Sequence, residues 1–108
     1  MLVMRAVDET LIAEAGRRMV AAAPGAQVVL FDSGAVGATN LHGSVGFLVV
    51  EPEVADEAEE SVRLHRTLRE LRVPADVIVV SRAYANRWRD VRGGVVHAAL
   101  SRGRVLAG

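Results

Sequence analysis

Residues 28–50 constrain the fold most strongly, because two apolar runs there flank a glycine-rich loop. Both runs, VVLF and VGFLVV, are rich in β-branched and aromatic residues, which is typical of strands buried on both faces. Glycines at positions 34, 37 and 43 make the loop between them permissive. The pattern predicts strands over 26–31 and 45–50. Because only a short loop joins them, we expect these strands to be antiparallel neighbours.

The rest of the sequence predicts alternating helices and strands. Acidic residues crowd the start of a long helical segment and arginines follow toward its end, which complements the helix dipole. Since this helix connects the second and third strands, it makes them parallel. The expected elements are a helix from Asp8 to Pro24, the long helix 54–72, a strand 76–80, a short helix capped by Ser81, a helix 95–101 and an edge strand 104–107. We therefore expect an α/β fold, a small mixed β-sheet flanked by helices, in one domain over residues 1–108.

Composition narrows the possible functions. The 108-residue chain carries 13 basic and 13 acidic residues and no net charge, so nothing indicates strong nucleic-acid binding. The absence of cysteine excludes thiol catalysis, disulfides and cysteine-ligated zinc. No apolar run approaches the roughly 18 residues of a membrane span, and no signal-like segment begins the chain. We therefore expect a cytoplasmic protein that makes no membrane contact.

The predicted topology brings the end of the first strand and the starts of the second and third to one edge of the sheet. The spacing along this edge resembles the signature of the minimal nucleotidyltransferases (MNT), a family of the DNA polymerase β superfamily. In that family a strand ends in Gly-Ser, ten residues follow, and the next strand opens with Asp-x-Asp. Here Ser33 precedes ten residues, and Ser44-Val45-Gly46 stands at the paired position. The positions that match the family's nucleotide-binding motif are Asp32, Ser33, Gly34, Gly37, Ser44 and Gly46.

The departures from the family lie at its metal site. The resemblance implies that two carboxylates and a third one on the next strand hold Mg²⁺ against a triphosphate. Asp76 matches the third, as a remnant catalytic carboxylate, but the pair is replaced by Ser44 and Gly46, so no metal ligand set is expected. Asp32 replaces a glycine that approaches the phosphates. If the Asp32 carboxylate lies 4 Å from a charged phosphate oxygen, their repulsion costs about 4 kcal/mol at an effective dielectric near 20. Asp32 could instead replace a lost metal ligand.

The resemblance implies a nucleotidyltransferase-like domain with a degenerate active site. We expect an inactive binding module that binds nucleoside triphosphates weakly if at all. It would act as the antitoxin-type partner of a HEPN-like protein in a toxin–antitoxin system, or as a homodimer. The alternative is an active metal-dependent nucleotidyltransferase that uses Mg²⁺ and ATP. A third alternative is a folded scaffold without function.

Other candidate residues carry weaker signals. His42 lies in the glycine-rich loop and could be a base or ligand, although a solvated loop position is the simpler interpretation. His65 and His97 are expected at surface or groove positions. Tyr84 and Trp88, four residues apart on a short helix, are expected to form a core or interface pair rather than a base-stacking platform. We also expect that Ser44→Asp with Gly46→Asp restores metal binding, and that a side chain at position 46 helps the strand.

Overall fold

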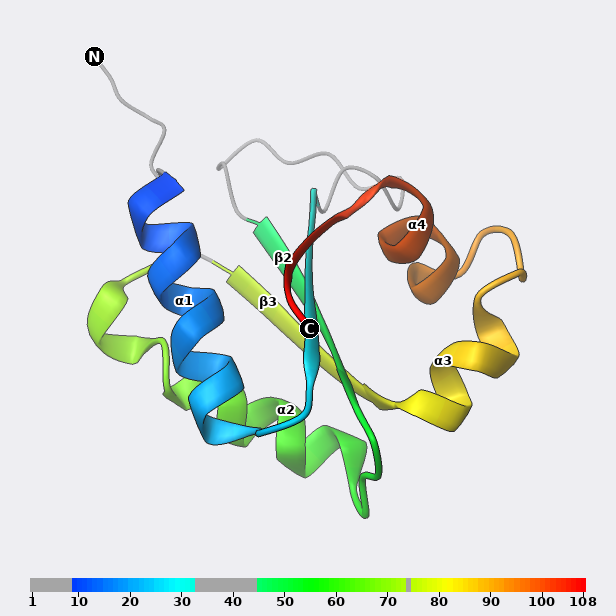
Figure 1. Ribbon diagram of the computed structural model, residues 1–108, viewed down its shortest axis with the longest axis horizontal. Coiled ribbons are helices and arrows are strands. Elements are labelled where there is room, and N and C mark those ends of the chain that lie inside the picture. Colours follow the sequence, from blue (N-terminus) through cyan, green and yellow to red (C-terminus); the bar gives the residue numbers. More distant parts are fainter. Residues whose placement is uncertain (1–8, 33–44, 74) are drawn as a thin grey trace.

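A four-stranded mixed sheet forms the centre of the protein (Figure 1). The computed structural model describes residues 9–32, 45–73 and 75–108. The strands lie in the order β3-β2-β1-β4, and their bounds are Gln27–Asp32 (β1), Val45–Glu51 (β2), Ala75–Ser81 (β3) and Arg104–Ala107 (β4). β1 pairs antiparallel with β2 and β4, whereas β2 and β3 are parallel. The α/β class, the antiparallel first pair, the parallel third strand and the C-terminal edge strand are therefore confirmed.

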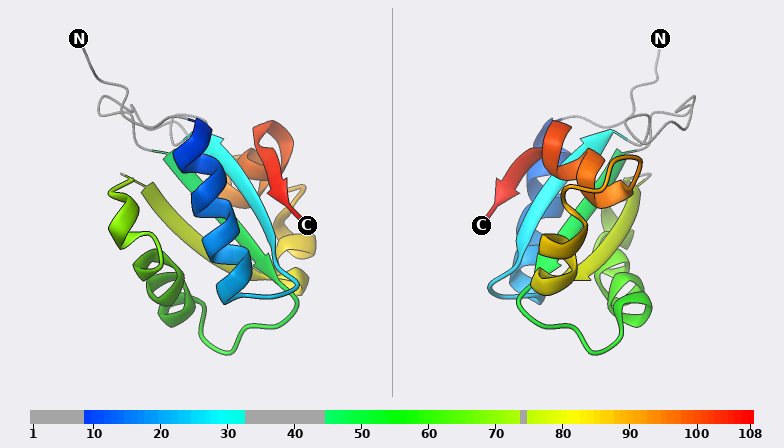
Figure 2. Two further views of the ribbon diagram at one scale, coloured as in Figure 1. Left: turned by 60° about the vertical axis from the view of Figure 1, so that its left-hand side comes forward. Right: turned by 90° about the vertical axis from the view of Figure 1, so that its right-hand side faces the viewer.

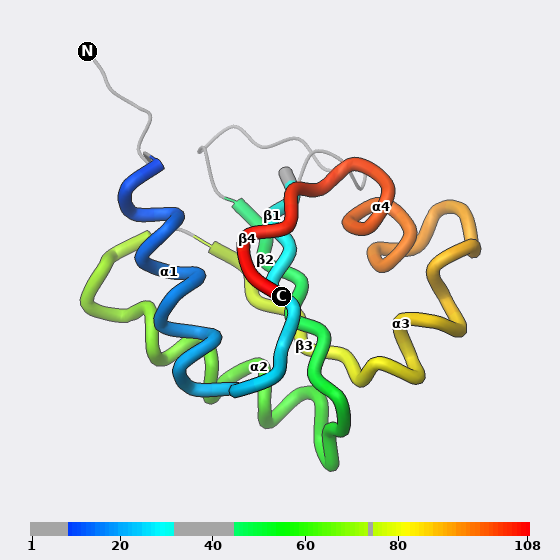
Figure 3. The backbone as a smooth tube through the Cα atoms, viewed as in Figure 1, coloured from blue at the N-terminus to red at the C-terminus, as the bar shows by residue number. Residues whose placement is uncertain are grey.

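Four α-helices cover the two faces of the sheet. The helices α1 (Glu9–Ala22) and α2 (Glu57–Arg66) lie on one face, and α3 (Arg82–Trp88) and α4 (Val95–Arg102) lie on the other (Figure 2). The chain ends in β4, which runs beside β1 (Figure 3). Among the described residues, no helix combines the length and apolar character needed to cross a membrane.

The two central strands, β1 and β2, are buried on both faces, as their uniformly apolar runs predict. Val28 and Phe47 are fully buried on the face of α1 and α2, where they join Met19 and Leu64. The alternate side chains, such as Leu48, pack on the opposite face against α3 and α4. Because β1 and β2 pack on both sides, their sequences show no alternation of apolar and polar residues.

The helix between β2 and β3 is shorter than the predicted 54–72. Its start is fixed by Asp56, whose side chain accepts a hydrogen bond from the Glu59 N–H at 3.0 Å. At its other end the Thr67 hydroxyl donates to the Leu64 carbonyl at 2.6 Å, and a single 3₁₀ turn, Arg69–Leu71, follows. The prediction failed because the acidic-to-basic gradient continues smoothly across both pieces, so it cannot show where the helix ends.

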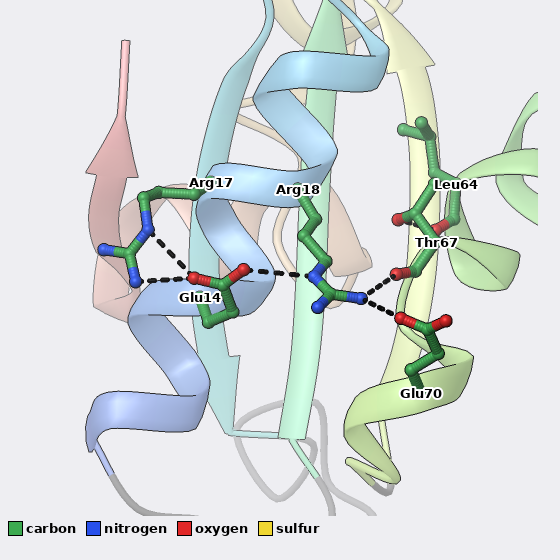
Figure 4. Close-up of polar contacts among 6 residues, drawn as sticks. All are labelled: Glu14, Arg17, Arg18, Leu64, Thr67 and Glu70. Carbon is green, nitrogen blue, oxygen red and sulfur yellow. Dashed lines mark hydrogen bonds and ion pairs between the residues drawn. The ribbon is translucent and has the colours of Figure 1, made fainter.

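A polar network joins α1 to the segment after α2 (Figure 4). Glu14 accepts from Arg17 at 2.6 Å and from Arg18 at 3.1 Å. Arg18 also donates to the Glu70 carboxylate at 3.1 Å and to the Thr67 carbonyl at 3.5 Å. The hydrogen bonds that Glu14 accepts from Arg17 and Arg18 lower the pKa of its carboxyl. The side chains of Glu14 and Arg18 are about one-third exposed and that of Glu70 is mostly exposed, so each ion pair contributes little to stability.

Candidate functional site

The strand register brings three of the predicted site positions to one end of the sheet. Gly46 pairs with Phe31 of β1 on one side and with Asp76 of β3 on the other. Asp32 pairs with Val45 in the next row. We call the row Phe31–Gly46–Asp76 the site row. The other predicted positions, Ser33, Gly34, Gly37 and Ser44, lie outside the described residues, as does His42.

The ring of Phe31 fills the space beside Gly46. A Cβ atom added to Gly46 would lie 2.5 Å from Cζ of Phe31 and 2.7–2.8 Å from its two Cε atoms, closer than real carbon contacts allow. Phe31 is only 4% exposed and belongs to the core beneath α3 and α4, so it cannot move aside freely. The expectation that a side chain at position 46 helps the strand is therefore wrong. The glycine is required by the close approach of this ring.

Asp76 is the one carboxylate in the site row. It is exposed at the start of β3 and shares a face of the sheet with Phe31 and Gly46. Among the described residues, no group of three or more histidine, aspartate or glutamate side chains could hold a metal ion. Mg²⁺ requires several oxygen ligands, and Gly46 supplies no side chain. The described residues of the site row therefore do not fit a Mg²⁺ ion.

An open groove begins at Asp76 and runs between α2 and β3. Its volume is about 570 Å³, and the charged or titratable side chains that line it are His65, Arg66, Arg69 and Asp76. The His65 Nε2–H donates to the Ala75 carbonyl at 3.2 Å. This histidine therefore occupies the satisfied groove position that the sequence predicts.

Three side chains of α2 cover the outer edge of β3. Glu57, Ser61 and His65 follow one another at intervals of four residues and so share one side of the helix. The Ser81 N–H donates to the Glu57 carboxylate at 3.3 Å, and the Val79 N–H donates to the Ser61 hydroxyl at 3.0 Å. We call these three residues the edge stripe. It occupies backbone groups that an edge strand otherwise leaves open to other chains.

Two partly buried glutamates, Glu51 and Glu60, lie close together at the opposite end of β2. Burial, together with a hydrogen bond to Glu60, raises the pKa of Glu51 to about 7. The hydrogen bond from Arg63 is the main reason that the pKa of Glu60 is lowered to about 2. The Glu51 Oε2 atom is buried and has no hydrogen-bond partner. Below about pH 7 the two carboxyl groups therefore retain one shared proton, and Arg63 compensates the charge of the ionised carboxylate.

The aromatic pair on α3 lies at the surface. Tyr84 is 40% exposed and Trp88 is 41% exposed, and their ring centroids are 5.9 Å apart. Of the two predicted roles, a core pair is therefore excluded and an interface pair remains. On α4, the His97 ring meets the Arg89 carbonyl through Nδ1 at 2.8 Å, which ties the loop after α3 to that helix.

Comparison with family models, with curated proteins and with solved structures finds no match to this chain.

Two features of this region were missed by reasoning from the sequence. The charges of the segment that holds the edge stripe were used only to predict the helix, although the period of four in Glu57, Ser61 and His65 is a usable signal. The contact between Phe31 and Gly46 has no local signal, because it depends on the register of two strands separated by twelve or more residues. A glycine inside an apolar strand was its only trace.

Proposed function

We propose that this protein is a nucleotidyltransferase-like domain that lacks metal-dependent transferase activity and acts as a binding module for a protein partner, such as a HEPN-like toxin. In this proposal Ser44-Val45-Gly46 stands where the active family has its metal-binding aspartates. In this proposal Asp76 is the remnant of the third carboxylate, and position 46 supplies no carboxylate beside it.

The contact between Phe31 and Gly46 carries the proposal. Loss of a carboxylate at position 46 alone could be a single substitution on an otherwise competent site. Here the vacated volume is occupied by a core aromatic ring. A carboxylate at position 46 requires Phe31 to repack, so the apolar ring and the metal site are mutually exclusive in this conformation.

The surface of α3 supports a binding role. Tyr84, Trp88 and Val91 are each 40–42% exposed and come from one short segment. Aromatic residues are enriched at protein interfaces, where they bury a large area at a small cost in conformational entropy. We expect these side chains to be covered when the partner is bound.

Two measurements test the proposal. The first is nucleotidyl transfer from labelled triphosphates with Mg²⁺ or Mn²⁺, for the chain alone and with the protein encoded beside it. We expect no labelled product. Label that disappears on chelation and in Asp76→Ala would overturn the proposal in favour of an active enzyme, the alternative that the position of Asp76 at the start of β3 would then support.

The second measurement is partner affinity. We expect Trp88→Ala to weaken binding of the co-encoded protein by about tenfold or more, as interface aromatic residues typically do. The matched control is Val62→Ala, because Val62 is an apolar residue 52% exposed on α2, on the opposite face of the sheet. Equal effects of the two substitutions, or no binding by the parent chain, would contradict the binding role at α3.

A further inference from the structure

A second hollow lies at the end of the sheet opposite the site row. Its volume is about 260 Å³, and it is open to solvent and bordered by the turn before β1, the end of β2, α3, α4 and the residue after β4. The turn is made by Gly25, whose φ of +87° is accessible to glycine at little cost. Five separate parts of the chain thus converge on this hollow, which we call the arginine hollow.

The polar side chains of the arginine hollow are all hydrogen-bond donors. They are Gln27, Arg82, Asn86 and Arg89, and no aspartate or glutamate lines the hollow. Arg82, Asn86 and Arg89 follow at i, i+4 and i+7, so one flank of α3 presents them together. The two arginines are separated by roughly 10 Å along the helix, at a rise of about 1.5 Å per residue.

Neither arginine is neutralised in this structure. Other arginines of the chain, such as Arg17, Arg18 and Arg63, form ion pairs with nearby glutamates. Within residues 9–32, 45–73 and 75–108, neither Arg82 nor Arg89 forms an ion pair. Two guanidinium groups that border one hollow repel each other, and a bound anion would remove that repulsion.

We propose that the arginine hollow binds the phosphate group of a small molecule. Guanidinium groups form paired, charge-assisted hydrogen bonds with phosphate oxygens, and two of them match a dianion better than the single charge of a carboxylate. The side-chain amides of Gln27 and Asn86 supply further donors. The volume is slightly below the usual range of about 300–1,000 Å³ for ligand pockets, which favours a small ligand. Val50 and Leu100 provide apolar walls for the carbon part of an ester.

This site is separate from the site row. It lies at the ends of β2 and β3, whereas the site row lies at their starts. It shares α3 with the proposed partner surface, but Tyr84, Trp88 and Val91 do not line the hollow. Phosphate binding by the isolated chain therefore tests this proposal without a partner, and its failure is distinguishable from failure of the proposed function.

The test is a titration of the isotope-labelled chain followed by backbone amide NMR shifts, at constant ionic strength because salt screens such contacts. The ligands are inorganic phosphate, glycerol 3-phosphate and acetate. We expect saturable shifts in residues 25–27 and 82–89 with both phosphates, and much weaker shifts with acetate. The tighter of the two phosphates identifies the ligand as the free ion or as an ester.

The variants are Arg82→Gln and Arg89→Gln, with Arg87→Gln as the matched control. Arg87 is an exposed arginine of the same helix that does not line the hollow. Each test variant should weaken phosphate binding about tenfold or more, since it removes charge-assisted hydrogen bonds to the phosphate, and Arg87→Gln should leave it unchanged. Asn86→Ala gives a second variant that keeps both charges and should weaken binding less. Unsaturable shifts, an equal loss in Arg87→Gln, or equal affinity for acetate would overturn the proposal.

Discussion

The two ends of the sheet are aligned by the same strand register but carry different side chains. At the site row, a buried aromatic ring, a glycine and one exposed carboxylate lie side by side across three strands. At the opposite end, β2 finishes in Glu51 with its shared proton, and β3 leads into Arg82 and the arginine hollow. The arginine hollow therefore lies at the end of the sheet where the resemblance does not place a site. A likeness in strand order thus predicts where strands meet, but not which side chains line each end of the sheet.

The largest expected effect comes from introducing a carboxylate into the site row. Gly46→Asp should lower the free energy of unfolding by about 3 kcal/mol or more, because the new side chain collides with the Phe31 ring and buries a charge. Chemical denaturation measures this loss. Gly46→Ala separates the two causes, since it introduces the collision without the charge and should cost less.

A double-substitution cycle sharpens this result. Phe31→Ala alone should cost about 3 kcal/mol through the cavity that it leaves. Combined with Gly46→Asp it should cost at least about 1 kcal/mol less than the sum of the two single changes, because the ring no longer opposes the carboxylate. Strict additivity would show that Phe31 yields without cost and that the site row could hold a carboxylate after all.

The next effect concerns the edge stripe, which accepts hydrogen bonds from backbone N–H groups in the second half of β3. Ser61→Ala should lower the free energy of unfolding by about 1–3 kcal/mol, because it leaves the buried Val79 N–H without a partner. Hydrogen exchange should show the Val79 amide losing protection. Ser61→Thr keeps the hydroxyl and should retain most of the stability, whereas Val62→Ala removes an exposed neighbour and should change little. If Ser61→Ala matches Val62→Ala, the hydroxyl does not cover the strand.

A smaller effect follows from the shared proton at the far end. The folded-state pKa of Glu51 is raised to about 7, so folding retains a proton that the unfolded chain releases near 4.5. Stability should therefore fall as pH rises from about 5 to 8, by the order of 1 kcal/mol once solvent screening is included. The lowered pKa of Glu60, about 2, acts in a different window, because its contribution is lost only as pH falls below 4.5.

Glu51→Gln tests this directly, because the amide stays neutral at every pH. The difference in unfolding free energy between variant and parent should grow in favour of the variant between pH 5 and 8, and other titrating groups cancel in that difference. Glu53→Gln, two residues along and exposed, is the control and should show a constant difference. A flat profile for Glu51→Gln would mean that Glu51 is ionised in the folded state throughout this range.

The sequence predicts the buried strands well because the apolar character that leads to their burial is present in each run by itself. Runs such as 28–31 and 45–50 are apolar enough to be buried on both sides wherever they pack. The end of α2 was not predictable in the same way, since it depends on the Thr67 hydroxyl. The 3₁₀ turn that follows ends at Arg72, whose φ of 55° lies in the left-handed region. Neither residue type announces a helix end by itself.

The sequence predicts where the candidate site lies better than it predicts which side chains fill it. Strand order and the parallel crossover suffice to bring Gly46 beside Asp76. Whether the volume at Gly46 is empty depends on which residue of β1 stands opposite, and a shift of one residue would replace Phe31 by Leu30. The arginine hollow required the positions of α3, α4 and β4 together, which no local pattern contains.

The smallest expected effect on stability comes from Asp76→Asn. This variant also tests whether the site row is inactive or binds a metal ion. Asp76→Asn should change the free energy of unfolding by less than about 0.5 kcal/mol, since the side chain is exposed and no ion pair in the described chain includes it. The informative measurement is the melting temperature of parent and variant with and without Mg²⁺. A ligand that binds only the folded state stabilises it by RT ln(1 + [L]/Kd), about 2.7 kcal/mol at a hundredfold excess over Kd, so specific binding would be plainly visible. We expect Mg²⁺ to shift both proteins equally and slightly. A rise confined to the parent would place a metal at Asp76, and the proposal of an inactive site would then fail.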